Sequence, residues 1–378
     1  MKLAAQMITG WLAIAFLSSS CAQPNALSDA SATKETVNLF KKLNKSSQEG
    51  YLIGHQDDLA YGVNWKYQPG RSDIKEVTGD YPALYGWELG GLEKDSPVDL
   101  DSVPFTLMKQ YIREGYQRGG AITISWHGNN PLTDKTAWDP APGTVASILP
   151  GGPKHEVFVQ QLNKIAAFLA DLKGSKGETI PVLYRPFHEL TGNWFWWGAN
   201  SCTPDEFKQL FRFTVNYLRT KKHLHNLIIV YNTSGDFKTE DEFLQRYPGD
   251  DVVDVVSFDT YQYKSPDVDK SFADNLSKNL TIVEEVAQAK HKLPALAETG
   301  FSQIPYPNWW TGVLATALQN RHPAYVLLWR NAGYKPSEKV TEYYAPYKGQ
   351  VSEQDFIKFY QLPQTLFEKD AARLKLYK

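Results

Sequence analysis

The sequence contains eight short apolar runs rich in strand-forming residues, separated by stretches with helical periodicity. Several runs are continuously apolar rather than alternating, which is typical of parallel strands covered on both faces. The runs begin at Tyr51, Ala83, Gly120, Ile180, Leu227, Val252, Leu293 and Tyr325. Eight strands that alternate with helices predict an α/β fold with one (β/α)8 TIM barrel.

An open doubly wound sheet is the alternative fold, but no glycine-rich phosphate-binding loop follows the first run. Amphipathic stretches predict helices over residues 105–119, 156–174, 203–221 and 275–291. Thr203, followed by proline, predicts a helix start, and Gly119 and Gly174 predict helix ends. A chain of 378 residues fits a single barrel.

The first 21 residues have the pattern of a secretory signal peptide. Lys2 precedes a short apolar run, and small residues then lead to Cys21. This arrangement resembles a bacterial lipoprotein box, with Cys21 as the lipid-attachment site; a plain signal peptide with a chance cysteine is the alternative. The run is too short to be a convincing membrane span. We expect a flexible tether over residues 22–35 and a catalytic domain over residues 36–378.

These features predict a secreted protein that contacts the membrane only through a lipid anchor. The residues directly after Cys21 include no acidic side chains of the kind that marks surface export, which favours the periplasm over the cell surface. With Cys21 modified, Cys202 has no partner for an intrachain disulfide. We expect a monomer.

Composition narrows the class of ligand. The formal net charge is -2 and no basic tract is present, so we expect no nucleic-acid partner. The chain also has 11 Trp and 21 Tyr. Aromatic faces stack on the apolar faces of sugar rings, and cores rarely need this much tryptophan. The aromatic content therefore indicates a carbohydrate ligand.

Polar or aromatic residues close almost every apolar run. In a (β/α)8 barrel the carboxyl ends of the strands meet on one face, and that face carries the chemistry. We therefore expect the functional site there. The run-end residues are His55, Gln56, Trp87, Glu88, Trp126, His127, His188, Glu189, Tyr261, Glu298, Trp329 and Arg330.

Two of these residues, Glu189 after the fourth run and Glu298 after the seventh, are candidates for catalysis. The barrel brings them to opposite sides of its mouth, and glycoside hydrolysis needs a pair of carboxyl groups flanking the scissile bond. The alternative is that each glutamate is a salt-bridge partner of Arg185 or Arg330. His55 could form structural hydrogen bonds or contact a sugar.

Other hydrolytic chemistries fit less well. His127 and His188 could join the glutamates as metal ligands, but no HExxH spacing is present and no cysteine joins them. No GxSxG nucleophile elbow is present either. We expect a carbohydrate site without a metal or cofactor.

Five segments resemble glycoside hydrolase family 26, whose members are mostly β-mannanases. "RPFHELTGNWFWWG" is similar to the family's acid/base segment and "PALAETG" to its nucleophile strand. "GAITISWHGNNP", "SFDTYQ" and "LLWRNA" also match, in the family's order, over nearly the whole chain after Lys34. The resemblance implies a (β/α)8 glycosidase that retains anomeric configuration through a covalent intermediate. It implies β-1,4-mannan, glucomannan or galactomannan as the substrate.

The resemblance also assigns roles to individual residues. It implies that Glu189 is the acid/base and Glu298 the nucleophile. It implies substrate contacts from His127, His188, Trp194, Tyr261, Trp329 and Arg330. Retention requires the two carboxyl groups to lie about 5–5.5 Å apart. We expect apolar neighbours to raise the pKa of Glu189, and a hydrogen bond from Tyr261 to stabilise the charged form of Glu298.

Two questions remain open in the sequence. The substrate could be a β-1,3- or mixed-linked glucan, or the chain could bind carbohydrate without cleaving it. The long connections over residues 90–102 and 331–353 could close the glycone end of the cleft, which would release mannobiose from chain ends. The alternative is that they are ordinary surface loops.

Overall fold

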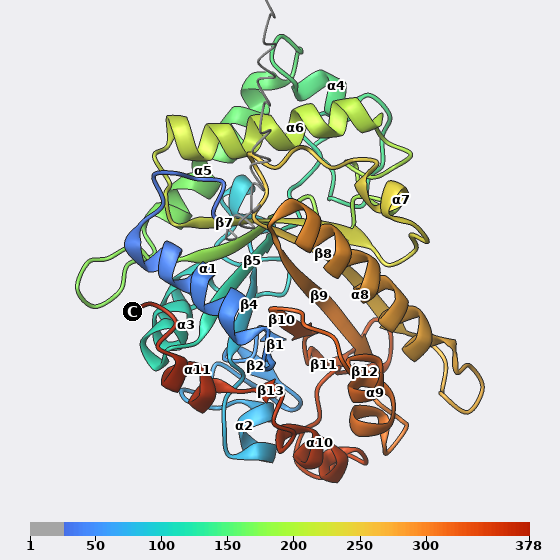
Figure 1. Ribbon diagram of the computed structural model, residues 1–378. Coiled ribbons are helices and arrows are strands. Elements are labelled where there is room, and N and C mark those ends of the chain that lie inside the picture. Colours follow the sequence, from blue (N-terminus) through green and yellow to red (C-terminus); the bar gives the residue numbers. More distant parts are fainter. Residues whose placement is uncertain (1–25) are drawn as a thin grey trace, which may run out of the picture.

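The computed structural model describes residues 26–378, in which eight parallel strands close into a barrel (Figure 1). Each strand pairs with the next in the chain, and the last pairs with the first. The strands are β1 (Tyr51–Gln56), β4 (Leu84–Glu88), β5 (Ala121–Trp126), β6 (Val182–Pro186), β7 (Leu227–Ser234), β8 (Val255–Gln262), β9 (Leu293–Phe301) and β10 (Tyr325–Leu328). All eight predicted runs, and the predicted barrel, are confirmed.

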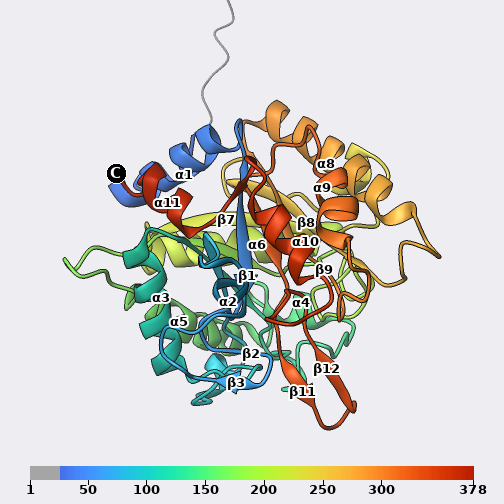
Figure 2. The ribbon, with the colours of Figure 1, turned by 90° about the horizontal axis from the view of Figure 1, so that it is seen from below.

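Helices cover the outside of the barrel, as Figure 2 shows for α1, α3, α5 and α8. The α-helices are α1 (Lys34–Ser46), α2 (Asp73–Thr78), α3 (Phe105–Arg118), α4 (Thr144–Ile148), α5 (His155–Ala170), α6 (Pro204–Asn216), α7 (Glu240–Leu244), α8 (Ser271–Lys290), α9 (Ala315–Ala317), α10 (Glu353–Tyr360) and α11 (Glu368–Leu374). Two small antiparallel hairpins, β2 (Tyr61–Gly62) with β3 (Trp65–Lys66) and β11 (Gly333–Lys335) with β12 (Val340–Glu342), extend from the loops, and β13 (Thr365–Leu366) pairs with β1.

Two of the three predicted helix boundaries, Gly119 and Thr203, are confirmed. Gly119 ends α3 in the left-handed conformation, with φ of 99°. Thr203 caps α6 and forms a capping box with Glu206. The prediction for Gly174 was wrong, because α5 ends at Ala170. The backbone N–H of Asp171 closes the last turn there, and Gly174 instead lies in a loop after the helix.

The alternation of side chains along each strand decides which run-end residues reach the barrel mouth. Trp87 of β4 stacks on Tyr111 of α3 with ring centroids 5.9 Å apart. Trp126 of β5 similarly stacks on Phe158 of α5 at 6.3 Å. Both tryptophans therefore belong to the packing between strands and helices. The residue directly after each tryptophan therefore points to the opposite side, toward the barrel interior.

The predicted boundary between tether and domain was wrong. Ser28 donates its backbone N–H to Asp254 at 2.6 Å, and Thr33 donates to the carbonyl of His225 at 2.9 Å and caps α1. Residues 28–35 are thus part of the folded domain, because polar partners before β7 and β8 bind them. The predicted signal peptide and Cys21 lie outside the described residues. Among residues 26–378, no helix has the length and apolar character needed to span a bilayer.

Candidate active site

Glu189 reaches the barrel mouth through an unusual turn at the end of β6. Phe187 and Glu189 both have left-handed backbone conformations, with φ of 53° and 50°. Side chains other than glycine rarely adopt this conformation, and such residues concentrate at functional sites. The turn places Glu189 in an open cleft together with Glu298.

Glu298 faces inward because of an irregularity in β9. Phe258 of β8 pairs with Leu296, but Asp259 pairs with Glu298, so one extra residue is inserted in β9 between these pairs. In a regular strand Glu298 would point to the opposite side from Ala297, which faces the barrel interior. The bulge instead brings Glu298 and Asp259 to the same side.

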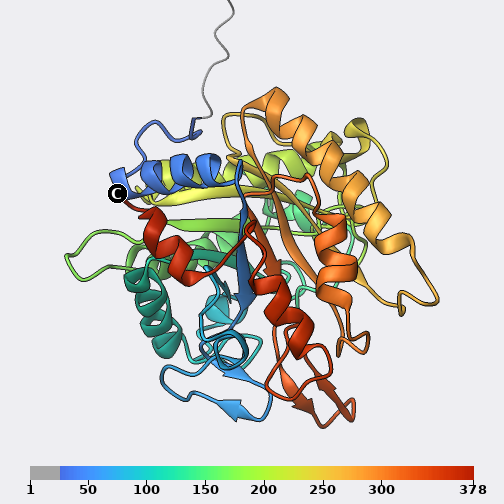
Figure 3. The ribbon, with the colours of Figure 1, turned by 60° about the horizontal axis from the view of Figure 1, so that its bottom comes forward.

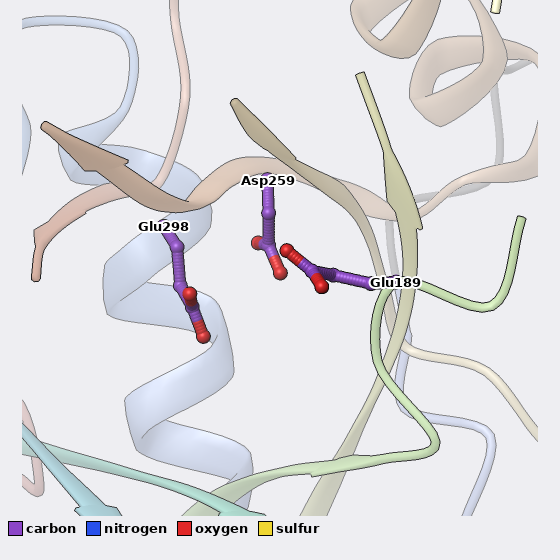
Figure 4. A group of neighbouring side chains, drawn as sticks. All are labelled: Glu189, Asp259 and Glu298. Atoms are coloured by element: carbon purple, nitrogen blue, oxygen red, sulfur yellow. The ribbon is translucent and has the colours of Figure 1, made fainter. Parts of the chain in front are cut away.

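Three carboxyl groups therefore gather at the centre of the barrel mouth (Figure 4). Glu189, Asp259 and Glu298 each present an oxygen within 4.8 Å of the other two. A separation of about 5 Å between catalytic carboxyls is the geometry of a retaining glycosidase, whereas inverting enzymes hold theirs about 6.5–9.5 Å apart. Asp259 was missed in the sequence, although it lies two residues before Tyr261 and so on the same side of β8.

Arg185 of β6 provides the positive charge within this group. Its guanidinium donates to Asp259 at 2.9 Å and also pairs with Glu298. Arg185 is buried, so the ion pairs are shielded from water. The alternative interpretation of Glu298 as a salt-bridge partner is thus correct in geometry and compatible with a catalytic role. Three carboxylates this close could also coordinate a divalent cation, so the expectation of a metal-free site stays a prediction.

The surroundings of Glu189 bring its pKa close to neutral pH. Burial, followed by the charge of Glu298, raises the pKa of Glu189 to about 7. Trp194 acts in the opposite direction, because its indole N–H donates to the Glu189 carboxylate at 2.7 Å. The raised pKa agrees with the expectation, but the neighbouring indole opposes the rise.

The aromatic segment after Glu189 is divided between surface and core. Trp194 is 42% exposed, whereas Trp196 and Trp197 are 0% exposed. The buried pair packs around Phe187, and their indole N–H groups donate to backbone carbonyls at 2.9 and 2.8 Å. Of this aromatic segment, only Trp194 and Phe195 line the cleft. The crowded tryptophans therefore mainly support the turn that carries Glu189.

The two predicted histidines, His127 and His188, contact each other beside Glu189. Nε2 of His127 and Nε2 of His188 lie 2.9 Å apart. Nδ1 of His127 lies 2.8 Å from the carboxylate of Glu88. Burial lowers the pKa of His188 well below its ordinary value, and the neighbouring His127 and Arg185 lower it further. His188 is therefore neutral.

The other cleft residues include predicted and unpredicted side chains. Tyr261 donates its hydroxyl to Glu298, as expected, and Trp329 lines the same cleft. Three further aromatic residues, Trp138, Tyr263 and Tyr344, also line it. They lie in the loops after β5, β8 and β10, where no regular spacing indicates which side chain turns inward.

His55 and Arg330, for which the sequence raised a sugar contact, are not among the side chains that line the cleft. His55 is buried and its Nδ1 lies 2.7 Å from Asp58, which supports the structural alternative. Arg330 forms ion pairs with Asp101 from the loop after β4 and with Glu342 of β12, and it is not among the side chains that line the cleft. The predicted sugar contact of Arg330 stays a prediction.

These ion pairs join the two long loops noted in the sequence. Arg330 bridges the loop over residues 90–102 and the β11–β12 hairpin. The hydroxyl of Tyr67, from the loop after β1, donates to the carbonyl of Ser102. Figure 3 shows the β2–β3 and β11–β12 hairpins at the same end of the molecule. The loops after β10, β1 and β4 thus form one connected wall beside the barrel mouth.

Comparison with known proteins identifies the family. The model of glycosyl hydrolase family 26 matches residues 28–324. The chain is 34% identical over 350 residues to a mannan endo-1,4-beta-mannosidase from Bifidobacterium adolescentis, covering 88% of this chain. It spans only 34% of the length of that protein and 56% of a Thermothelomyces thermophilus mannan endo-1,4-beta-mannosidase.

Solved structures agree over the whole barrel. A GH26 beta-mannanase from Bacteroides ovatus is 42% identical, with a TM-score of 0.87, and the match covers 92% of this chain and 98% of that one. The catalytic domain of a Bacillus sp. JAMB-750 GH26 endo-beta-1,4-mannanase is 32% identical, with a TM-score of 0.84, covering 95% of this chain and 98% of that one.

Proposed function

The chain belongs to glycosyl hydrolase family 26, and on this premise we propose that it is a retaining hydrolase of β-1,4-mannosidic bonds in mannan, glucomannan or galactomannan. The observation that carries the proposal is the pair of carboxyl groups on Glu189 and Glu298, whose oxygens lie within 4.8 Å of one another. Their surroundings differ in the manner that two opposite roles require.

The reaction begins with Glu189 protonated and Glu298 ionised. Glu298 attacks the anomeric carbon as Glu189 gives its proton to the glycosidic oxygen, so the leaving chain departs with a new hydroxyl. A covalent glycosyl ester then links the sugar to Glu298. Glu189, now ionised, takes a proton from water, and the water oxygen displaces Glu298 with a second inversion.

Reducing-sugar release from glucomannan and galactomannan tests this proposal. We expect activity in the wild type and a loss of several orders of magnitude in both Glu189→Ala and Glu298→Ala. Near-wild-type activity in either variant would refute the assignment of roles. Cleavage of mixed-linked glucan but not mannan would keep the mechanism and reject the substrate, and binding without cleavage would indicate a carbohydrate-binding protein.

The connected wall of loops supports the release of short products. Arg330 ties the loop over residues 90–102 to the β11–β12 hairpin at one side of the barrel mouth. A polymer that meets this wall could place only a short glycone segment in the cleft. We therefore propose mannobiose release from chain ends over internal cleavage.

For localisation we propose a periplasmic lipoprotein attached through Cys21. The basic start, the apolar run and the small residues before Cys21 support this. The first described residues dock at the amino ends of β7 and β8, on the face opposite to Glu189 and Glu298. An anchored chain would then present its cleft away from the anchor. Palmitate labelling that persists in Cys21→Ala would reject the anchor.

A further inference from the structure

Glu88, at the carboxyl end of β4, is a buried carboxylate with all of its hydrogen-bonding positions occupied. One oxygen accepts the backbone N–H groups of Gly90 and His127, each at 2.6 Å. The other accepts the hydroxyl of Ser125 at 2.6 Å and lies 2.8 Å from Nδ1 of His127. The two-carboxylate mechanism gives Glu88 no role, although it contacts a histidine of the cleft.

These contacts fix the protonation state of Glu88. Burial by itself would raise the pKa of this carboxyl, but His127 and the surrounding donors hold it at about 2. An ionised carboxylate can only accept hydrogen bonds. The proton in the bond between Glu88 and His127 must therefore belong to Nδ1 of the imidazole, which fixes the ring's tautomer when it is neutral.

The contact between His127 and His188 also determines the tautomer of His188. Their Nε2 atoms lie 2.9 Å apart, so one proton lies between them. If His127 carried that proton, neutral His188 would hold its own proton on Nδ1. That nitrogen is buried and has no hydrogen-bond partner in the described part of the chain. Because a buried N–H without an acceptor is unfavourable, the proton belongs on Nε2 of His188, and Nε2 of His127 accepts it.

We propose that Glu88 is a positioning residue that sets the tautomers of both cleft histidines, with the proton on Nδ1 of His127 and on Nε2 of His188. The three residues lie at the carboxyl ends of the neighbouring strands β4, β5 and β6, and the last of them, His188, directly precedes Glu189. The effect of these tautomers on catalysis rests on the proposed function, because a bound sugar would form hydrogen bonds that depend on the pattern of donors and acceptors in the cleft. Reversal of the tautomers exchanges donor for acceptor at every ring nitrogen.

Glu88→Gln tests this directly, because glutamine has nearly the same shape but carries a donor. When the amide oxygen of the new glutamine accepts the same two backbone N–H groups, its amide nitrogen donates to Nδ1 of His127. We expect the proton of His127 to move to Nε2 and that of His188 to move to Nδ1. Two-bond ¹H–¹⁵N NMR spectra of histidine-labelled protein, assigned with His127→Asn and His188→Asn, report both tautomers without reference to activity.

Ser125→Ala is the matched control. It removes one hydrogen bond from the same carboxylate but leaves Glu88 ionised, so the wild-type tautomers should persist. For a tautomer effect, we expect Glu88→Gln to lower kcat/KM on a manno-oligosaccharide by about tenfold or more, and Ser125→Ala by less than about threefold. Equal losses of kcat/KM in the two variants would overturn the proposal, since the effect of Glu88 would then come from its packing and not from the tautomers.

The wild-type spectrum is decisive even if Glu88→Gln does not fold. A proton on Nδ1 of His188 in the wild type would overturn the proposal. The expected tautomers in a protein that does not cleave mannan would reject the proposed function and leave the role of Glu88 in place.

Discussion

The indole N–H of Trp194 donates to the carboxylate of Glu189 at 2.7 Å, from a ring that is 42% exposed at the mouth of the cleft. Under the proposed function, Trp194 would thus offer an apolar face to a sugar and also stabilise the ionised form of Glu189. Burial and Glu298 oppose this stabilisation and hold the pKa of Glu189 at about 7. The proposed role of Glu189, an acid that becomes a base within one turnover, benefits from such a balance.

Trp194→Phe should extend activity to higher pH. The substitution keeps an aromatic face but removes the hydrogen bond to ionised Glu189, so the pKa of Glu189 rises and the acid stays protonated further into the alkaline range. The alkaline limb of the kcat/KM profile, which reports the pKa of the free enzyme, should therefore shift to higher pH. Trp138→Phe is the control, since Trp138 stacks on His127 at 4.9 Å and makes no described hydrogen bond to Glu189. Equal shifts in both variants, or an acid shift, would contradict the prediction.

Tyr261→Phe should reduce turnover more than substrate binding. The hydroxyl of Tyr261 donates to Glu298, and its loss leaves Arg185 as the remaining described side-chain donor to that carboxylate. In the proposed second step Glu298 leaves as a carboxylate, and loss of one donor to an oxygen on which charge develops typically lowers kcat by about 100-fold or more. Steady-state kinetics on manno-oligosaccharides would measure this. A variant with raised KM and unchanged kcat would show that Tyr261 acts in binding instead.

Much of the site could be predicted because the barrel converts strand ends into neighbours. Glu189, Glu298, His127, His188 and Tyr261 all follow or end apolar runs, and the structure brings them into one cleft. The parallel barrel fixes this face whatever the details of packing. The sequence therefore contained the central chemistry of the candidate site.

The remaining features depended on local geometry. A β-bulge, which no residue pattern marked, aligns Glu298 with Asp259. Trp138 turns inward from a long irregular loop, where side-chain direction has no period. The burial of Trp196 and Trp197 could not be predicted, because composition does not distinguish a ring that supports a turn from one that faces solvent.

Arg185→Met should destabilise the fold in a pH-dependent manner. Arg185 is buried between Asp259 and Glu298, and its loss would leave two uncompensated carboxylates, a change that typically costs about 3–5 kcal/mol. Burial and then Glu298 already raise the pKa of Asp259 well above its ordinary value, and without Arg185 it would rise further. A carboxyl whose pKa is higher folded than unfolded loses stabilising free energy as the pH rises above the unfolded value of about 4.

The loss of unfolding free energy in Arg185→Met, relative to the wild type, should therefore be small near pH 4 and increase toward neutral pH. Urea unfolding of variant and wild type at pH 4.5 and 7.5 would measure it. Arg212→Met is the control, because Arg212 forms a bidentate pair with Asp251 at 2.7 Å on the surface. Its loss should cost less than about 1 kcal/mol at both pH values. A deficit in Arg185→Met that does not change with pH would contradict the argument.

The loop wall should determine product length. We expect mannobiose to dominate the early products of the wild type on unsubstituted mannan, as resolved by chromatography. Asp101→Asn combined with Glu342→Gln keeps Arg330 but removes both of its charged partners, so the loop after β4 and the β11–β12 hairpin should separate and admit longer glycone segments. Longer oligosaccharides should then appear early. Lys94→Met is the control: Lys94 lies on the same loop after β4, but its exposed ion pair is with Asp134 of the loop after β5, so its loss should not affect products. A broad ladder from the wild type would show that the loops leave the cleft open.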